Sequence, residues 1–254
     1  MATNARLKTN YRPQTNSPLP PKETLPSMYD LPSENSEELG LPDDFHYFQP
    51  QLLRETFCPP DYPADQVYVA SDLNLYYDVR NYQWYKRPDW FAVVGVPRFY
   101  EERELRMSYV IWQEGVAPCV VVELLSEGTE KEDLGETLRE IKQPPTKWEV
   151  YERILRVPYY IVFSRELETF RAFQLTGGHY QELMLPEKRL WLPEINLGLG
   201  LWTGICQGLE RQWLRWYDAQ NNWIPTLVEK TEQEKQRAEQ LAAQLRALGV
   251  EPIV

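Results

Sequence analysis

Short apolar runs separated by polar residues and turns dominate the middle of the chain, from residue 67 onward. Runs of this kind that are rich in β-branched and aromatic residues are typical of β-strands. The stretches 91–94 and 120–122 are apolar at every position, so we expect central strands buried on both faces. The predicted strands of this region are residues 67–69, 73–77, 91–94, 109–112 and 119–125.

The pattern changes to helical spacing between residues 130 and 155. Trp148, Tyr151, Ile154 and Leu155 fall on one stripe of a helix, whereas the charged residues between them, such as Glu152, fall elsewhere. Another strand is predicted at 159–163, after the helix has ended. This strand, helix, strand order predicts an α/β core.

The chain after this core shows the pattern of an antiparallel extension. Residues 170–175 and 180–183 flank Gly177-Gly178 and predict a β-hairpin. The Trp-rich section 190–224 predicts further strands or loops that close the sheet, with turns at Gly198, Gly200 and Asn221-Asn222.

Both ends of the chain differ from its middle. Residues 1–65 are rich in proline and polar residues, and we expect an arm whose first two dozen residues are disordered. Anchors such as Phe45, Leu52, Leu53 and Phe57 would hold its second half against the core, with a short helix near 50–55. The predicted domains are the arm at 1–65, the α/β domain at 66–225 and a charged helical segment at 226–254.

The C-terminal segment is helical in pattern from residue 227 to 248. Ala238, Leu241, Leu245 and Leu248 recur by threes and fours, as in a heptad seam that could join two copies of the chain. A single amphipathic helix that packs on its own domain or stands free in solvent is an equal alternative for so few repeats.

Composition narrows the class of protein. The apolar fraction of 43% can bury a sizeable core, and we expect a cytoplasmic protein because neither a signal peptide nor an apolar run of roughly 20 residues is present. The 3 cysteines are too few and too far apart for a disulfide framework or zinc knuckle. A net charge of −11 opposes nucleic-acid binding. A local basic surface could still bind phosphates, because salt screens the more distant charges, and the candidates are Lys86-Arg87, Arg103 and Arg106.

Two carboxylates stand where the predicted strands should be buried. Asp89 comes directly before the run 90–94, and Glu123 lies within 120–125. A buried carboxylate costs several kcal/mol unless it is paired, protonated or bound to a metal. If the two lie about 4 Å apart on adjacent strands, their repulsion is about 4 kcal/mol at an effective dielectric near 20. A divalent cation would turn that repulsion into a binding site, and Mg²⁺ or Mn²⁺ suits such oxygen ligands.

Lys147, one helical turn before Tyr151, is the candidate cation of the same site. A lysine here could stabilise charge that develops on a phosphate or orient an attacking water. Each residue also has a plain alternative. Asp89 could lead a strand from an ordinary turn, Glu123 could be a buried carboxylate paired with Arg or Tyr, and Lys147 could be a solvated helix residue.

Other candidate sites are weaker. Gly198-Leu199-Gly200 lacks the third glycine of a dinucleotide loop, and no phosphate-binding Gly-Lys-Ser/Thr sequence is present. His46 and His179 lie in the arm and beside a Gly-Gly turn, which disfavours a nucleophile-histidine arrangement. Asp133 fits a helix cap or first-turn acid better than a metal ligand.

The residues around these candidates resemble the PD-(D/E)XK nuclease superfamily and, within it, the Uma-two family of restriction endonucleases, which is abundant in cyanobacteria. The similarity runs from about residue 67 to 163, through Pro88-Asp89, 122–126, 133–135, Lys147 with Tyr151, and 157–160. It implies a restriction-endonuclease-like fold, in which a mixed central sheet is flanked by helices. It also implies that Asp89 and Glu123 bind the metal, together with a backbone carbonyl near Leu124.

The chain departs from the superfamily pattern at the lysine. Two residues beyond the glutamate, where the lysine usually stands, this chain has Leu125. The Uma-two pattern instead is similar to this chain in placing the lysine on the following helix, ahead of a tyrosine, which assigns that role to Lys147. The resemblance therefore predicts a metal-dependent endonuclease acting on nucleic acid, most simply DNA. The alternative is an inactive nuclease-like scaffold or interaction protein that assembles through its terminal segments.

Overall fold

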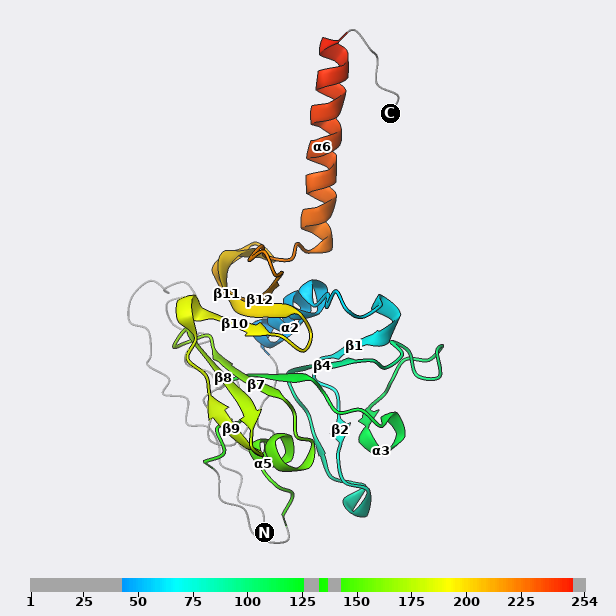
Figure 1. The fold of residues 1–254 in the computed structure, drawn as a ribbon, viewed down its shortest axis with the longest axis vertical. Helices are drawn as coiled ribbons and strands as arrows, with labels where there is room; N and C mark the ends of the chain where they lie inside the picture. Colours follow the sequence, from blue (N-terminus) through cyan, green and yellow to red (C-terminus); the bar gives the residue numbers. More distant parts are fainter. Residues whose placement is uncertain (1–42, 126–132, 137–142, 249–254) are drawn as a thin grey trace, which may run out of the picture. The chain divides into compact units, whose positions relative to one another are not determined.

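The computed structural model describes residues 43–125, 133–136 and 143–248. Its largest element is a mixed sheet of six strands in the order β1-β4-β6-β7-β8-β9 (Figure 1). The β6 and β7 strands pair in parallel, and the other neighbours pair antiparallel. The strands are β1 (Val67–Ala70), β4 (Trp90–Val94), β6 (Val120–Leu124), β7 (Tyr159–Ser164), β8 (Thr169–Thr176) and β9 (His179–Glu182).

The central strands are buried on both faces, as their unbroken apolar runs predict. Side chains that alternate along β4 and β6 point to opposite sides of the sheet. Trp90 and Val122 belong to one hydrophobic core, whereas Phe91 and Val121 belong to the other. The predicted mixed α/β architecture is therefore confirmed, and it has an apolar core on each face of the sheet.

The first core is covered by helix α2 (Asp44–Thr56) and by a small sheet of β10 (Arg189–Leu192), β11 (Leu197–Cys206) and β12 (Leu209–Tyr217). Phe45 packs against Phe163 of β7 and stacks on Trp213 of β12, so α2 lies between the two sheets. The expected anchors Phe45, Leu52, Leu53 and Phe57 are buried. The helix starts earlier than the predicted 50–55, because Asp43 caps it by accepting a hydrogen bond from the His46 N–H at 3.0 Å.

The second core is covered by the segment before β7. It consists of the short helix α5 (Lys147–Glu149) and a π-helical turn, η3 (Val150–Ile154). The π turn changes the phase of the predicted stripe: Tyr151 and Leu155 are buried, but Ile154 is 42% exposed. Glu152, expected on the polar side, is buried and accepts a hydrogen bond from the Tyr180 N–H at 2.8 Å.

A third sheet of the order β3-β2-β5 lies beside this core. Its strands are β2 (Leu75–Tyr76), β3 (Tyr85–Lys86) and β5 (Tyr109–Val110). The strand predicted at 109–112 is shorter than expected, because helix α3 (Ile111–Glu114) begins at once and takes in Trp112. The remaining short helices are η1 (Ala64–Gln66), η2 (Val79–Asn81) and η4 (Pro186–Lys188).

The expectation of turns at Gly198 and Gly200 is wrong, since both glycines lie inside β11. A Cβ on Gly198 would lie 2.0 Å from the ring of Tyr217 on β12, so the glycine permits close ring packing rather than a chain reversal. The predicted turn at Asn221-Asn222 is present, with Asn221 at a φ of 64°.

Helix α6 (Leu227–Ala247) follows the small sheet, as predicted. Thr226 and Glu229 form a capping box at its start, and Glu229 also pairs with Arg215 of β12, with an Nη1 to Oε1 distance of 3.0 Å. None of the described helices is long and apolar enough for a membrane span.

Candidate active site

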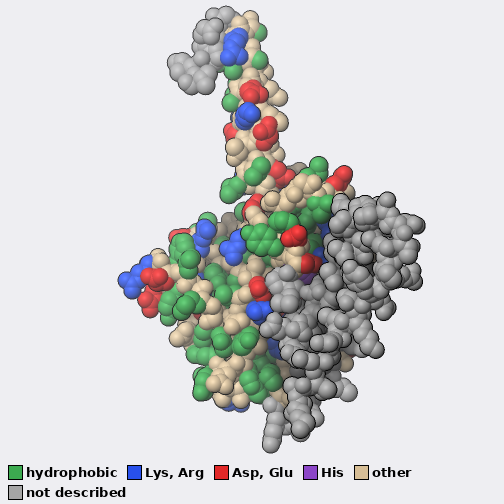
Figure 2. Space-filling view, turned by 180° about the vertical axis from the view of Figure 1, so that it is seen from behind, with side chains coloured by type: hydrophobic (Ala, Val, Ile, Leu, Met, Phe, Trp, Pro, Cys, Tyr) green, Lys and Arg blue, Asp and Glu red, His purple; other side chains and the backbone are tan. Residues whose placement is uncertain are grey.

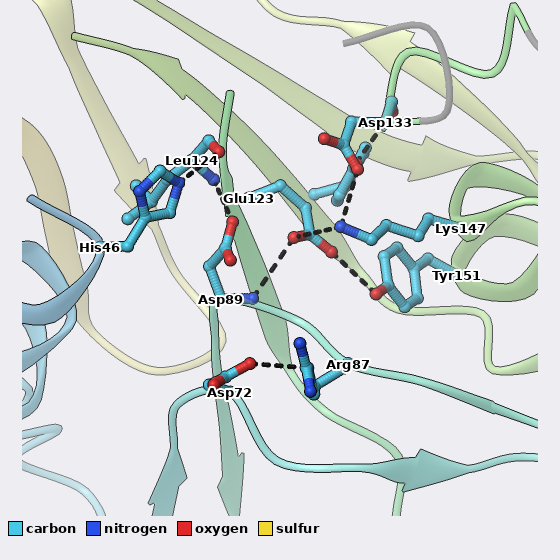
Figure 3. A network of polar contacts seen from close by, with 10 residues as sticks. His46, Asp72, Arg87, Asp89, Glu123, Leu124, Asp133, Lys147 and Tyr151 are labelled. Carbon is cyan, nitrogen blue, oxygen red and sulfur yellow. Dashed lines mark hydrogen bonds and ion pairs between the residues drawn. The ribbon is translucent and has the colours of Figure 1, made fainter. Parts of the chain in front are cut away.

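Asp89 and Glu123 meet at the end of two adjacent central strands, as expected. β4 and β6 pair with Trp90 opposite Val122, which places the residue before Trp90 beside Glu123. The Asp89 N–H donates to Glu123 Oε2 at 3.3 Å, and the Leu124 N–H donates to Asp89 Oδ2 at 2.6 Å (Figure 3). Glu123 is fully buried, and Asp89 is partly buried. The two carboxylates are thus fixed by each other's strand.

Lys147 and Tyr151 contact the two side-chain oxygens of Glu123 from the segment that covers the second core. Lys147 Nζ lies 3.0 Å from Oε2, and the Tyr151 hydroxyl donates to Oε1 at 2.8 Å (Figure 3). A capping box between Thr146 and Glu149 fixes the start of α5 directly before Lys147. The π turn that follows carries Tyr151, and π turns recur at functional sites.

Asp133 is the second partner of Lys147, with Nζ 2.9 Å from Oδ1. Its side chain is fully buried, and the Tyr160 hydroxyl donates to its backbone carbonyl at 2.8 Å. Sequence reasoning gave Asp133 only the role of a helix-start acid and missed this contact. The local sequence gives no signal for this contact, because it depends on the burial of Lys147, which the structure shows.

His46 reaches the site from helix α2, on the other side of the sheet. Its Nε2 lies 3.2 Å from the carbonyl oxygen of Leu124 (Figure 3). Its Nδ1 lies 2.9 Å from Asp43 Oδ1. Arg165 forms an ion pair with Asp43. Sequence reasoning set His46 aside as part of the arm. An aspartate three residues before a histidine at a helix start was the signal that could have found it.

Burial has the largest effect on the pKa values of the two carboxylates, and the charge of Lys147 opposes it. Burial, and then the charge of Asp89, raise the pKa of Glu123 to about 7 against the opposing effect of Lys147. Burial likewise raises the pKa of Asp89. Burial alone would lower the pKa of Lys147, but Asp133, Glu123 and Asp89 outweigh it and raise that pKa well above its ordinary value. The lysine therefore stays charged while the carboxylates compete for its charge.

The pKa of His46 follows the same balance. Burial lowers it, but the hydrogen bond with Asp43 and the charge of Asp89 more than offset burial, and the net pKa lies above the ordinary value. The Nε2 donor is thereby favoured over a lone pair, which suits the Leu124 carbonyl oxygen as its acceptor.

The oxygen atoms at this point suit a hard divalent cation. The described residues hold no group of three or more Asp, Glu, His or Cys side chains placed to bind a metal. Mg²⁺ needs fewer, because it keeps several waters and uses one or two carboxylates together with substrate oxygens. Asp89, Glu123 and the carbonyl of Leu124 could supply such a set.

Two other polar residues have partners of their own. His179 is a mostly exposed residue of β9 and lies 3.7 Å from Glu152, and Asp72 pairs with Arg87 at 2.7 Å. The proposed basic surface is not formed as expected. The guanidinium of Arg106 is buried against Glu114 at 2.7 Å, and Lys86 is buried as well.

Comparison with known proteins identifies a family to which this chain is similar. A family model named Uma2, described as "Putative restriction endonuclease", matches residues 50–206. The chain belongs to the Uma2 family. Asp89, Glu123 and Lys147 all lie within the matched residues, whereas His46 precedes them. The match confirms the resemblance that the motifs indicated and places the chain among proteins described as nucleases.

A solved structure gives a second, weaker likeness. It is described as a putative nuclease belonging to DUF820 from Anabaena variabilis ATCC 29413, and it shares 11% identity with this chain. The match has a TM-score of 0.44 and covers 62% of this chain and 77% of that one. No curated protein matches this Uma2 chain.

Proposed function

We propose that this Uma2 protein is a metal-dependent endonuclease that hydrolyses phosphodiester bonds of nucleic acid, with DNA as its substrate. One observation carries the proposal: two carboxylates of adjacent buried strands lie together, and a lysine that is itself nearly buried contacts one of them. Family membership supports the same class of reaction.

In this proposal Asp89, Glu123 and the Leu124 carbonyl hold Mg²⁺ or Mn²⁺. The bound cation would polarise a phosphoryl oxygen and lower the pKa of a coordinated water. Tyr151 holds one oxygen of Glu123, which fixes the plane of that carboxylate. Lys147 keeps its proton and supplies a fixed positive charge on the side facing a phosphate. His46 holds the Leu124 carbonyl oxygen in place from the opposite side.

The test combines binding with cleavage. Asp89→Asn and Glu123→Gln keep the shape of each side chain and remove its charge. We expect Mn²⁺ binding, measured by calorimetry without substrate, to weaken at least about tenfold in each variant. Cleavage of DNA and RNA mixtures with Mg²⁺ or Mn²⁺ should fall in parallel. Glu182→Gln is the matched control, because this carboxylate is exposed and pairs with Arg171 on the hairpin.

The alternative is an inactive scaffold that kept the fold. One observation favours it: Lys147 and Tyr151 already satisfy both oxygens of Glu123 without an added cation. A folded wild-type protein that binds no Mn²⁺ and cuts no nucleic acid would support the scaffold and contradict the nuclease. Cleavage lost in both site variants and kept in Glu182→Gln would decide for the nuclease.

We further propose that helix α6 joins two copies of the chain. None of its residues is buried, and Leu241 and Leu245 are 52% and 38% exposed. Figure 2 shows apolar side chains between charged groups of both signs along this helix. A heptad seam with a second copy would cover these leucines.

A further inference from the structure

A row of aromatic rings on the small β3-β2-β5 sheet has no role in either core. Tyr76 and Tyr85 are cross-strand partners, with ring centroids 5.4 Å apart. Trp112 of α3 continues the row, 6.4 Å from Tyr76. We call Tyr76, Tyr85 and Trp112 the aromatic strip.

The alternation of the strands turns the strip away from the core. Leu75 and Lys86 are the neighbouring cross-strand pair, and both are buried. Residues that alternate with them therefore point to the other face. Tyr85 and Trp112 are 45% and 41% exposed, so flat ring surface is open to solvent.

The segment that carries the strip presents two exposed guanidinium groups. Residues 79–88 contain Arg80, Lys86 and Arg87 and no acid, and Lys86 is buried while both arginines are exposed. Arg80 is 87% exposed and pairs with Asp78 at 3.3 Å, and Arg87 is 46% exposed and pairs with Asp72 at 2.7 Å. Exposed ion pairs of this kind contribute little stability, so both guanidinium groups can exchange a carboxylate for a phosphate.

The same segment leads directly into the candidate active site. Tyr85 and Asp89 are close neighbours along the chain, which limits their Cα separation to about 14 Å. Figure 3 shows Arg87 beside Asp89, at the edge of the carboxylate pair. A chain of nucleotides lying along residues 80–87 would therefore reach Asp89.

From this arrangement we propose that the aromatic strip stacks unpaired bases of a single-stranded nucleic acid and delivers the strand to Asp89 and Glu123. The inference rests on the proposed nuclease function and names its substrate class. Paired bases present no free face to the rings, and the net negative charge disfavours binding through phosphates alone. Stacking contributes binding free energy that needs no positive charge, so it can offset the repulsion between the phosphates and the acidic protein.

The test measures binding without cleavage. The full chain in EDTA is titrated into a fluorescently labelled oligo(dT) of about 20 nucleotides, a length that exceeds common single-strand site sizes, and into a duplex of the same length, with anisotropy as the readout. We expect tighter binding of the single strand. Tyr85→Ala and Trp112→Ala should each weaken that binding about tenfold, and Tyr85→Phe, which keeps the ring, should bind as the wild type does.

A second readout isolates stacking. A single-stranded probe that contains 2-aminopurine should lose fluorescence on binding to the wild type and to Tyr85→Phe, but much less with the alanine variants. Tyr47→Ala is the control for loss of an exposed tyrosine, because Tyr47 lies on α2 and is 68% exposed. Circular dichroism confirms that each variant is folded.

Three results would overturn the proposed role of the aromatic strip. They are equal affinity of the wild type and the alanine variants, a preference for the duplex, and no binding at all. Each result is separable from the nuclease proposal. Cleavage with unchanged binding in the alanine variants would refute the strip alone, and stacking without cleavage would refute the nuclease alone.

Discussion

Lys147 Nζ lies 2.9 Å from Asp133 Oδ1 and 3.0 Å from Glu123 Oε2, so one ammonium group bridges two fully buried carboxylates. Glu123 is a candidate metal ligand, whereas Asp133 is not one and contacts Lys147 instead. The lysine can therefore release Glu123 to a cation and keep Asp133 as its partner. Asp133 is in this way a positioning residue for Lys147.

Removing the Asp133 carboxylate should cost both stability and activity. We expect Asp133→Ala to lower the free energy of unfolding by about 3 kcal/mol, because a buried ammonium loses one of its two charged partners. Asp133→Asn keeps an oxygen acceptor and should cost less. Urea denaturation measures the loss of stability, and the rate of nucleic-acid cleavage measures the loss of activity. An Asp133→Ala protein that cuts like the wild type would refute the positioning role.

The Tyr151 hydroxyl should matter more for activity than for stability. Tyr151→Phe removes one hydrogen bond to Glu123, at a cost of about 1 kcal/mol in unfolding free energy. Tyr109→Phe is a matched control, because the Tyr109 ring is buried and its hydroxyl donates a similar hydrogen bond to the Val116 carbonyl oxygen at 2.8 Å. We expect similar stability losses and reduced cleavage only in Tyr151→Phe. Equal cleavage by both variants would contradict this.

His46 should influence metal affinity through the Leu124 carbonyl. His46→Ala is expected to weaken Mn²⁺ binding about tenfold, as loss of a group that orients a ligand does. His46→Gln retains a donor and should recover part of the loss. His179→Ala, on the exposed hairpin, is the control and should leave binding unchanged. Calorimetry on the wild type and these variants decides, and identical affinities would remove His46 from the site.

The pKa of Glu123 predicts a pH-dependent stability in metal-free buffer. Burial raises that pKa to about 7 from an ordinary value of 4.5, so the folded state keeps a proton that the unfolded chain has already released. The resulting stability is complete below pH 4.5 and is lost as pH rises to 7. We expect the unfolding free energy of the wild type, relative to Glu123→Gln, to fall across this window. A rise would show that Lys147 keeps Glu123 ionised.

The role of helix α6 is tested without disturbing its anchor. A chain that ends after Gln236 keeps the Glu229 contact to Arg215 but loses the leucines of the proposed seam. Sedimentation should then report a monomer in place of a dimer, and Leu241→Lys with Leu245→Lys should act alike. Unchanged sedimentation of both proteins would refute the seam.

Much of the sheet was predictable, because a short run of apolar residues is stable only where both faces of the strand are buried. The stretches at 91–94 and 120–122 predict central strands, and Glu123, directly after the second stretch, required a partner. The same physical reasoning predicts that Asp89, Glu123 and Lys147 lie together, and their contacts agree with it. Their catalytic and metal-binding roles stay predictions, as does the division into arm, domain and tail. The first two dozen residues of the arm lie outside the described part of the chain.

What could not be predicted depended on tertiary contacts. His46 joins the site because α2 packs across the sheet. The spacing of Asp43 and His46 indicates a helix start, but it does not predict that long-range contact. The π turn at Val150–Ile154 moves Ile154 to the surface and Glu152 inward, against a regular helical stripe. Gly198 looks like a turn residue in the local sequence, but its strand needs room for the ring of Tyr217, a partner 19 positions later.

The parallel pairing of β6 with β7 has a consequence for how the protein folds. Within the described six-stranded sheet it is the one parallel pairing. Its connection, residues 125–158, is longer than the connection 95–119 between β4 and β6, and it carries Asp133, Lys147 and Tyr151. Closing a long loop is slow, because its entropy is lost before the strands gain contacts. We expect the antiparallel pair β4 and β6 to form first, with Asp89 and Glu123 already side by side. A chain at that stage of folding would hold two repelling acids and no lysine, so catalytic competence should appear only with the final closure of the sheet.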